Sequence, residues 1–260
     1  MSRQAKAVQK TVYGLEYIAL LAVIIIIWAV MEQEGKLNSV ILPAPADIVE
    51  TFISSVRDGS LPVNLGISIL RVFKGYAISA VVGVSLGILV GLSAHLERIT
   101  NLLVQILRPI PPIAWIPLVI LWFGIGESGK IFLIFLGGFF TIFINVADGI
   151  HQTDPKLIEV SKALETPFFK HVFQVVIPSA APNIFTGLRV GLGSCWTCVV
   201  AAELVASSTG IGYMIMNARQ FGRTDIVIVG MLAIGICGKI MDSLLKAVEK
   251  KVVWTSRRGS

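Results

Sequence analysis

The sequence predicts an all-α, polytopic membrane protein with six transmembrane helices. Of the 260 residues, 55% are hydrophobic and only 15% are charged, and the mean hydropathy is +0.80. Soluble proteins average about 45–50% apolar and about 25% charged residues, and a soluble fold of this length could not bury so much apolar sequence. Ten-residue segments of alternating polarity, which are typical of membrane barrels, do not occur. Helices in a bilayer are therefore the expected architecture.

Six apolar segments are long enough to span a membrane, for which a helix needs about 20 residues. They are segments 15–31, 73–94, 101–123, 131–150, 183–206 and 226–245. The first segment follows three basic residues, as in a signal peptide. It is succeeded by Glu32, Gln33 and Glu34, however, and not by the small residues of a cleavage site. We therefore expect an uncleaved anchor helix.

The distribution of Lys and Arg predicts that both termini are cytoplasmic. With the N-terminus inside, 12 basic residues fall in cytoplasmic segments and 5 in external ones. This asymmetry follows the positive-inside rule. The net charge of +6 is therefore explained by topology, and no basic stripe with interleaved aromatic residues predicts a nucleic-acid site. The connection 151–182 becomes a cytoplasmic loop.

The loop 151–182 has the pattern of two short helices. Asp154-Pro155 and Thr166-Pro167 each place an N-capping residue before a proline, which fits the first position of a helix. An amphipathic segment follows each pair, and Pro178 and Pro182 lead into the fifth span. Phe168, Phe169 and Phe173 offer a bulky apolar surface. From the pattern alone, the helices rest on lipid headgroups or dock a cytoplasmic partner.

No motif for catalysis, nucleotide binding or metal binding survives inspection. Gly124 to Lys130 reads GIGESGK, but Ile131 replaces the hydroxyl that would bind Mg²⁺, and the segment follows an apolar helix instead of a strand. Cys195 and Cys198 form a C-x-x-C pair inside an apolar segment, where we expect them to act as packing residues. The three histidines show no ligand spacing, so we predict no metal site.

Polar residues and prolines inside the spans predict a pore. The third span contains four prolines, which break its hydrogen-bond ladder, and broken backbone is tolerated where it is buried or lines a cavity. Simple kinked packing is the alternative. Glu203 could gate the outer end of the pore or pair with a cation such as Arg219. The candidate pore-lining residues are Pro112, Trp115, Asn145, Trp196 and Glu203.

Glycines spaced by four predict close helix packing in the second and fifth spans. Gly83, Gly87 and Gly91 form one series, and Gly187 and Gly191 form the other. Small residues at this spacing let two backbones approach closely within a membrane. We favour contacts within one chain over a seam between two copies.

Several strings resemble one known family. Glu159-Val160-Ser161, then Glu165, then Val176-Ile177-Pro178 is similar to the cytoplasmic loop of binding-protein-dependent ABC importer permeases. LPAPADIV from Leu42, RPIPPIAWIPLVILWFGIGE from Arg108 and GLRVGLGSCWTCVVAAELVA from Gly187 resemble the sulfonate, taurine and nitrate branch. That family usually has two alanines in place of Val160 and Ser161, and a glycine in place of Glu165. Here Thr166-Pro167 is expected to supply the turn.

The resemblance implies a type I ABC importer permease: a non-catalytic, channel-forming subunit for a small anion, in a bacterial cytoplasmic (inner) membrane. It implies a homodimer, two ATPase subunits that bind ATP and Mg²⁺, and an extracytoplasmic substrate-binding protein. No cofactor is expected in this chain. The residues implied to couple to the ATPase are Glu159, Val160, Ser161, Ala163, Leu164, Glu165, Phe168 and Pro178.

The expected domain organisation follows from these assignments. Residues 1–64 form an anchor helix and an external segment, 65–250 the permease core with its coupling loop 151–182, and 251–260 a cytoplasmic tail. An ion-coupled secondary transporter is the alternative function. It would predict inverted repeats and a relay of ionisable residues inside the membrane, and neither is visible in the sequence.

Overall fold

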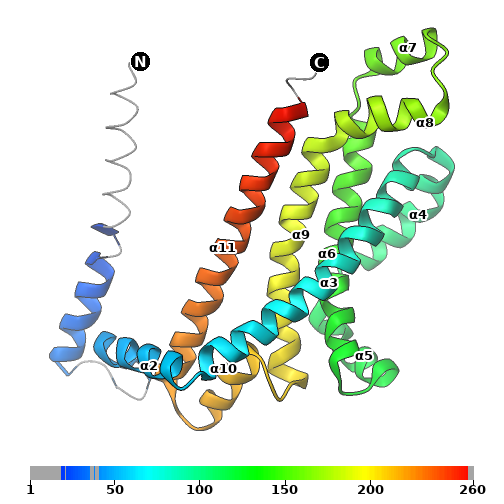
Figure 1. Cartoon of the computed structure of the whole chain (residues 1–260). Coiled ribbons are helices and arrows are strands. Elements are labelled where there is room, and N and C mark those ends of the chain that lie inside the picture. The colour runs from blue at the N-terminus through cyan, green and yellow to red at the C-terminus, as the bar shows by residue number, and fades with distance from the viewer. Residues whose placement is uncertain (1–18, 21, 36–37, 39–40, 257–260) are drawn as a thin grey trace, which may run out of the picture. The chain divides into compact units, whose positions relative to one another are not determined.

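The computed structural model describes residues 19–20, 22–35, 38 and 41–256, and these residues contain helices and no strand (Figure 1). The all-α prediction is therefore confirmed. The labelled elements are α2 (Pro45–Arg57), α3 (Ser60–Gly91), α4 (Ala94–Leu107), the 3₁₀ helix η1 (Pro112–Trp115), α5 (Ile116–Phe123), α6 (Glu127–His151), α7 (Pro155–Ala163), α8 (Phe168–His171), the π helix η2 (Val172–Val176), α9 (Ile177–Ala206), α10 (Ile211–Gln220) and α11 (Thr224–Ser256).

The chain forms two compact units. One contains the described parts of Met1–Pro62 together with Met214–Met231, and the other contains Val63–Tyr213 and the described part of Leu232–Ser260. In the smaller unit, Thr51 of α2 donates a hydrogen bond to Asp225 at the start of α11, at 2.8 Å. The larger unit contains all the candidate pore-lining and coupling residues.

Four helices in the described residues are long and apolar enough to cross a membrane: Ser60–Gly91, Glu127–His151, Phe168–Val205 and Thr224–Lys250. They contain or overlap the second, fourth, fifth and sixth predicted spans. The third predicted span is a bent pair, Ala94–Leu107 with Pro112–Phe123, whose halves meet at 87°. The described residues thus contain four helices that could span a membrane, or five if the pair is one span, and the predicted number of six is not confirmed. Ala22–Gln33 belongs to the first predicted span, of which 15–18 and 21 lie outside the described residues.

Helix α6 is packed between α3 and α9, and glycines create the space. A Cβ atom on Gly87 of α3 would lie 2.8 Å from Val146 of α6, and one on Gly191 of α9 would lie 2.5 Å from Ile142. Gly83, Gly91 and Gly187 face α6 in the same way. Packing within the chain is therefore confirmed. Lipid tails are as apolar as these side chains, so the hydrophobic effect does not drive helices together within a membrane. Close van der Waals contact between α3, α6 and α9 stabilises their packing instead.

The loop 151–182 differs from the prediction in its second half. The side chain of Asp154 caps α7, accepting from the backbone N–H of Lys156 at 2.9 Å, as expected. The segment after Pro167 is not a separate short helix, because α8, η2 and α9 run on without a break. Pro178 has no N–H and its ring would clash with an α-helical carbonyl, so a π turn just before it lets the helix continue. Thr166 does not cap this helix; Pro167 holds that position without a side-chain bond.

The turn after α7 is made by Glu165 itself, and not by Thr166-Pro167 as expected. Glu165 has a φ of 48°, the left-handed conformation that favours glycine. The N–H of Thr166 donates to the carbonyl of Ser161 at 3.1 Å, and that of Glu165 to Lys162 at 3.0 Å. These two bonds form a Schellman motif, which satisfies the last carbonyls of the helix. The family's usual glycine is thus replaced by a strained glutamate in the same turn.

Candidate functional site

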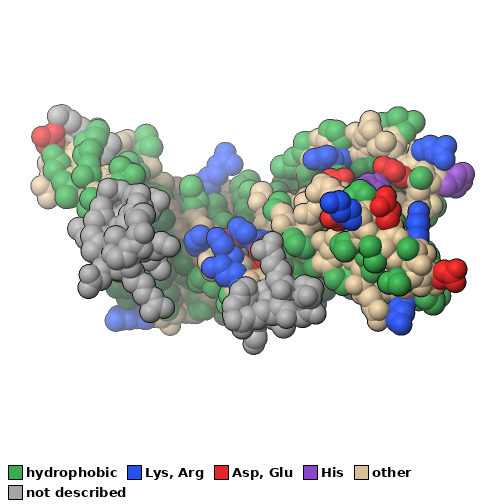
Figure 2. Space-filling model, turned by 90° about the horizontal axis from the view of Figure 1, so that it is seen from above, with side chains coloured by type: hydrophobic (Ala, Val, Ile, Leu, Met, Phe, Trp, Pro, Cys, Tyr) green, Lys and Arg blue, Asp and Glu red, His purple; other side chains and the backbone are tan. Residues whose placement is uncertain are grey.

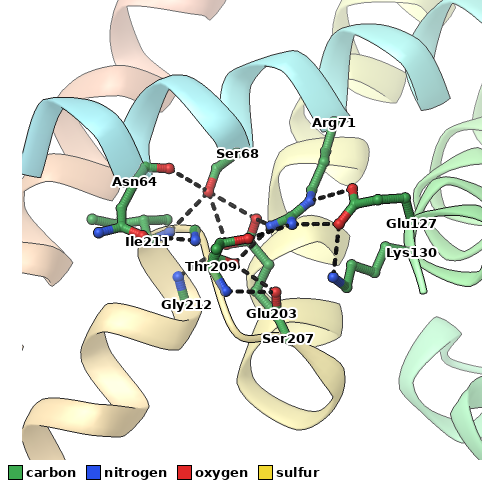
Figure 3. A network of polar contacts seen from close by, with 11 residues as sticks. Asn64, Ser68, Arg71, Glu127, Lys130, Glu203, Ser207, Thr209, Ile211 and Gly212 are labelled. Carbon is green, nitrogen blue, oxygen red and sulfur yellow. Dashed lines mark hydrogen bonds and ion pairs between the residues drawn. The ribbon is translucent and has the colours of Figure 1, made fainter. Parts of the chain in front are cut away.

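A buried ion network joins α3, α6 and the end of α9 (Figure 3). The Glu203 carboxylate accepts hydrogen bonds from Arg71 Nη1 at 2.7 Å, from Ser68 Oγ at 2.8 Å, and from the Gly212 N–H at 3.0 Å. Arg71 and Glu203 are only 3% and 1% exposed. A buried charge is stabilised only when it is paired and hydrogen-bonded, and Glu203 meets both conditions. The network therefore holds Glu203 firmly inside the protein.

Arg71 connects Glu203 to the start of α6. Its guanidinium contacts Glu127 through two parallel hydrogen bonds, Nε to Oε2 at 2.8 Å and Nη2 to Oε1 at 2.6 Å. Lys130 Nζ donates to the same carboxylate at 2.9 Å. Glu127 and Lys130 belong to the GIGESGK string. This string therefore forms the connection to α6 and its first turn, and it supplies two charges to the network. With two carboxylates and two cations, the network has no net charge.

The same network fixes the connection between α9 and α10. Arg71 donates to the carbonyl and the hydroxyl of Thr209, both at 2.8 Å, and the Ser68 hydroxyl accepts from the N–H of Ile211 at 2.9 Å. Gly210 has a φ of 105°, and a Cβ atom there would overlap the carboxylate of Glu203. The carboxylate thus lies against the N-terminus of α10, where negative charge is favourable. The hydrogen bonds of the network therefore hold the segment between α9 and α10 against α3.

Sequence reasoning missed Arg71 and misassigned the partner of Glu203. The cation that pairs with Glu203 is Arg71 and not Arg219, which is exposed and lies 3.9 Å from the sulfur of Met216. Arg71 precedes the second predicted span at 73–94, but α3 begins at Ser60, so Arg71 is inside the helix. An arginine buried in an apolar helix requires an anionic partner, and this requirement could have predicted the pair.

The break between α4 and α5 borders a cavity of about 390 Å³. Three of the candidate pore-lining residues, Pro112, Trp115 and Asn145, lie in its wall. Trp196 does not: it is 6% exposed, and its indole N–H donates to the carbonyl of Ile234 at 3.0 Å. Glu203 belongs to the ion network. The structure thus brings together three of the five candidates and places the other two in the protein interior.

The loop carries a surface of exposed apolar side chains, which we call the loop surface: Leu157, Val160, Leu164, Phe168, Phe169 and Phe173, each between 46% and 76% exposed. In Figure 2, which looks onto this end, hydrophobic side chains alternate with charged ones over the part that carries α7 and α8. An exposed apolar patch of this kind marks a surface for a partner or a membrane.

The remaining predicted coupling residues have mixed positions. Glu159, Ala163, Glu165 and Pro178 are exposed. Ser161 is buried, with its Oγ 2.8 Å from Nδ1 of His171, so it joins α7 to α8 and is not available to a partner.

Comparison with known proteins identifies the family. Residues 79–254 match the family described as the binding-protein-dependent transport system inner membrane component. The chain belongs to this family. It is the permease subunit of an ABC importer, a non-catalytic, multi-pass membrane protein whose partners are an ATPase and a substrate-binding protein. The alternative of an ion-coupled transporter is thereby set aside.

Several relatives of this permease carry substrate names. A putative aliphatic sulfonates transport permease protein of Bacillus subtilis is 43% identical, over 89% of this chain and 84% of that protein. The taurine transport system permease protein of Escherichia coli is 31% identical, over 90% and 87%. The nitrate import permease protein of Synechocystis is 32% identical, over 90% and 87%.

Solved structures share the permease fold. One is an amino acid ABC transporter, with a TM-score of 0.65 and 15% identity over 77% of this chain and 98% of that one. Another is an inward-facing form of the MetNI methionine ABC transporter, with a TM-score of 0.61 and 21% identity over 73% and 92%.

Two cysteines of the permease lie in the protein interior. Cys195 and Cys198 are buried free thiols, as predicted, and Cys195 Sγ lies 3.3 Å from the carbonyl of Ile134. Within the described residues, no group of three His, Cys, Asp or Glu side chains is placed to hold a metal ion.

Proposed function

We propose that this permease forms one half of a homodimeric pore that imports a small organic or inorganic oxyanion, with the loop surface docked on a cytoplasmic ATPase. Two ATPase subunits bind ATP and Mg²⁺, an external protein delivers the solute, and both termini face the cytoplasm of a bacterial inner membrane. The loop surface is the observation that carries this proposal. A folded loop that presents six apolar side chains on the capped helix α7, the turn after it and the helix that follows is suited to a protein cleft.

The relatives support the substrate class. The names of three relatives, at 31–43% identity over most of the chain, refer to aliphatic sulfonates, taurine and nitrate. Sulfonates, taurine and nitrate all carry a small, delocalised oxyanion group. The basic excess of the predicted cytoplasmic segments supports the orientation.

The docking surface is tested by a pair of matched substitutions. Phe169 and Phe221 are 76% and 74% exposed, but only Phe169 lies on the loop surface. We expect Phe169→Ser to weaken co-purification of the ATPase subunits by about tenfold or more, because a buried aromatic side chain contributes a few kcal/mol to an interface. Phe221→Ser should leave the complex unchanged. Equal ATPase recovery with both variants would contradict the docking surface.

Transport assays test the substrate and the assembly. Proteoliposomes that contain the permease with its ATPase and binding protein should import a labelled alkylsulfonate, taurine or nitrate in an ATP-dependent way. The mass of the detergent-solubilised complex should correspond to two permease and two ATPase subunits. Failure to import any of the three solutes would exclude the proposed substrate class, and one permease copy per complex would exclude the homodimer.

A further inference from the structure

The cavity at the broken helix has one charged residue in its wall, Arg108. Arg108 follows α4 directly, and its backbone N–H donates to the carbonyl of Val104 at 2.9 Å. Its guanidinium makes no ion pair or hydrogen bond with the described part of the chain, in contrast to Arg71, Arg189 and Arg223, which all pair with carboxylates. The Arg108 side chain is exposed, so its guanidinium is accessible to a dissolved anion. Arg108 is therefore a cation with an unused binding capacity.

Two polar side chains of α6 face the same cavity. Asn145 Nδ2 donates to the carbonyl of Thr141 at 2.8 Å, which leaves its second N–H available, and Thr141 adds a hydroxyl. A guanidinium with an amide and a hydroxyl nearby is a typical donor set for an oxyanion, because charge-assisted hydrogen bonds are short and strong. Arg108 is the residue directly after α4, and Asn145 and Thr141 belong to α6.

The rest of the wall is apolar. Trp115, Leu136, Phe140 and Val190 are among its apolar residues. The volume of about 390 Å³ falls within the range of small-molecule sites, about 300–1,000 Å³. A cavity with a cationic end and an apolar wall fits an anion that carries a hydrocarbon tail. It contains no carboxylate for the ammonium group of taurine, and nitrate has no tail for the apolar wall.

Arg108 also lines a second cavity, of about 570 Å³, which has a different charge. Its wall contains the carboxylates of Glu97 and Asp148, together with His151, whose Nε2 lies 3.7 Å from Glu97. This cavity includes the last residue of α6 and therefore lies nearer to the loop. Its carboxylates disfavour an anion, and the cavity on the Trp115 side of Arg108 has no carboxylate in its wall.

We propose that the cavity between Arg108 and Trp115 is a transient binding site for an alkylsulfonate on its way through the permease. Arg108, Asn145 and Thr141 receive the sulfonate group, and the apolar wall receives the alkyl chain. This inference rests on the proposed function, because it selects one member of the oxyanion class. It assigns to the permease a part of the selectivity that would otherwise belong to the external binding protein alone.

The test measures binding of labelled butanesulfonate to the purified permease–ATPase complex without the binding protein. The complex is held in phosphatidylcholine nanodiscs, so that no anionic lipid competes for Arg108. We expect Arg108→Gln to weaken binding by about tenfold or more, since a hydrogen bond to a charged group is lost. Arg98→Gln is the matched control, because Arg98 lies in α4, the helix that Arg108 directly follows, lines neither cavity and donates to the carbonyl of Ala94. Unchanged affinity in Arg108→Gln, or no binding by the unmodified complex, overturns the proposal.

Two further variants test the site without changing Arg108, in case Arg108→Gln fails to fold. Asn145→Asp preserves the side-chain shape and places a carboxylate near Arg108, so butanesulfonate binding should fall by about tenfold. Val190→Trp narrows the apolar end at a residue that is 52% exposed, and should weaken butanesulfonate more than methanesulfonate. Equal affinity for both sulfonates, before and after this substitution, excludes the apolar wall as a tail site.

Uptake separates this inference from the proposed function. If the unmodified, complete importer takes up no oxyanion, the proposed function fails. If it imports butanesulfonate and Arg108→Gln binds as tightly as Arg98→Gln, only the cavity assignment fails.

Discussion

The ion network and the loop surface belong to the same compact unit but differ in how far their side chains are buried and paired within the chain. In the network, Arg71 and Glu203 are almost fully buried and every charge has a partner. On the loop surface, Phe169 and Leu164 are 76% and 73% exposed, and no described side chain covers them. The network is complete within one chain, whereas the described residues leave the apolar side chains of the loop surface exposed. This contrast supports a structural role for the network and the docking role that we propose for the loop surface.

The two regions also use the left-handed backbone differently. In the network, the residue with positive φ is Gly210, and the space beside it is filled by the Glu203 carboxylate. In the loop, Glu165 adopts positive φ although a side chain strains it, and it is exposed. The interior thus allows only glycine, while the surface tolerates a less favourable residue.

The largest expected effect is the loss of the central cation of the network. Arg71→Ala should lower the free energy of unfolding by about 3–5 kcal/mol, because it leaves Glu203 buried and unpaired. Arg189→Ala is the control: Arg189 pairs with Asp242 at 2.6 Å, but both side chains are more than a third exposed, so we expect a much smaller loss of stability. Thermal unfolding of the detergent-solubilised protein measures both. If the two variants lost similar amounts of stability, the burial of the Arg71–Glu203 pair would not make it more stabilising than the exposed Arg189–Asp242 pair.

A smaller effect is expected at the glycine of the network. Gly210→Ala should destabilise the protein by about 1–3 kcal/mol, because it combines an unfavourable φ with a clash against Glu203. Gly193→Ala, in α9, is the control. Its Cβ would meet nothing within 4 Å, and alanine favours a helix over glycine by about 1 kcal/mol. The same thermal measurement should therefore give opposite signs, and equal signs would contradict this assignment.

The smallest expected effect concerns the turn of the loop. Glu165→Gly relieves a left-handed strain of about 1–2 kcal/mol but adds chain freedom equivalent to about 0.5–1 kcal/mol, so a net stabilisation below about 1 kcal/mol is expected. Glu159→Gly, within α7, should instead destabilise that helix by about 1 kcal/mol. Hydrogen exchange of the α7 amides reports both changes. Faster exchange in Glu165→Gly would mean that the glutamate side chain stabilises the turn.

Much of the architecture was predictable because it depends on local properties. Four apolar segments predicted spans that the structure contains, the prolines predicted the break before α5, and Asp154 predicted the start of α7. The second half of the loop was predicted wrongly, because prolines usually end helices. The π turn at Val172–Val176 is an exception that local rules do not anticipate.

Among the candidate site residues, the sequence predicted the positions of those that are exposed or that lie near the prolines of the broken helix. Trp115 and Asn145 line a cavity, and Phe168 lies on the loop surface. Trp196 and Glu203 are instead buried, because an aromatic or polar residue inside a span can pack against neighbouring helices as well as line a pore. Ser161 is buried in the loop, where it contacts His171.

The sequence by itself determined the membrane class, the family and the start of α7, since hydropathy, linear motifs and helix caps are properties of neighbouring residues. Only the tertiary structure decided that Arg71 pairs with Glu203, 132 positions along the chain, and that Arg108 pairs with no described residue. The physical reason is that the partner of a charge inside a membrane protein depends on which helices pack together. In this permease, the glycine contacts of α6 with α3 and α9 set that packing.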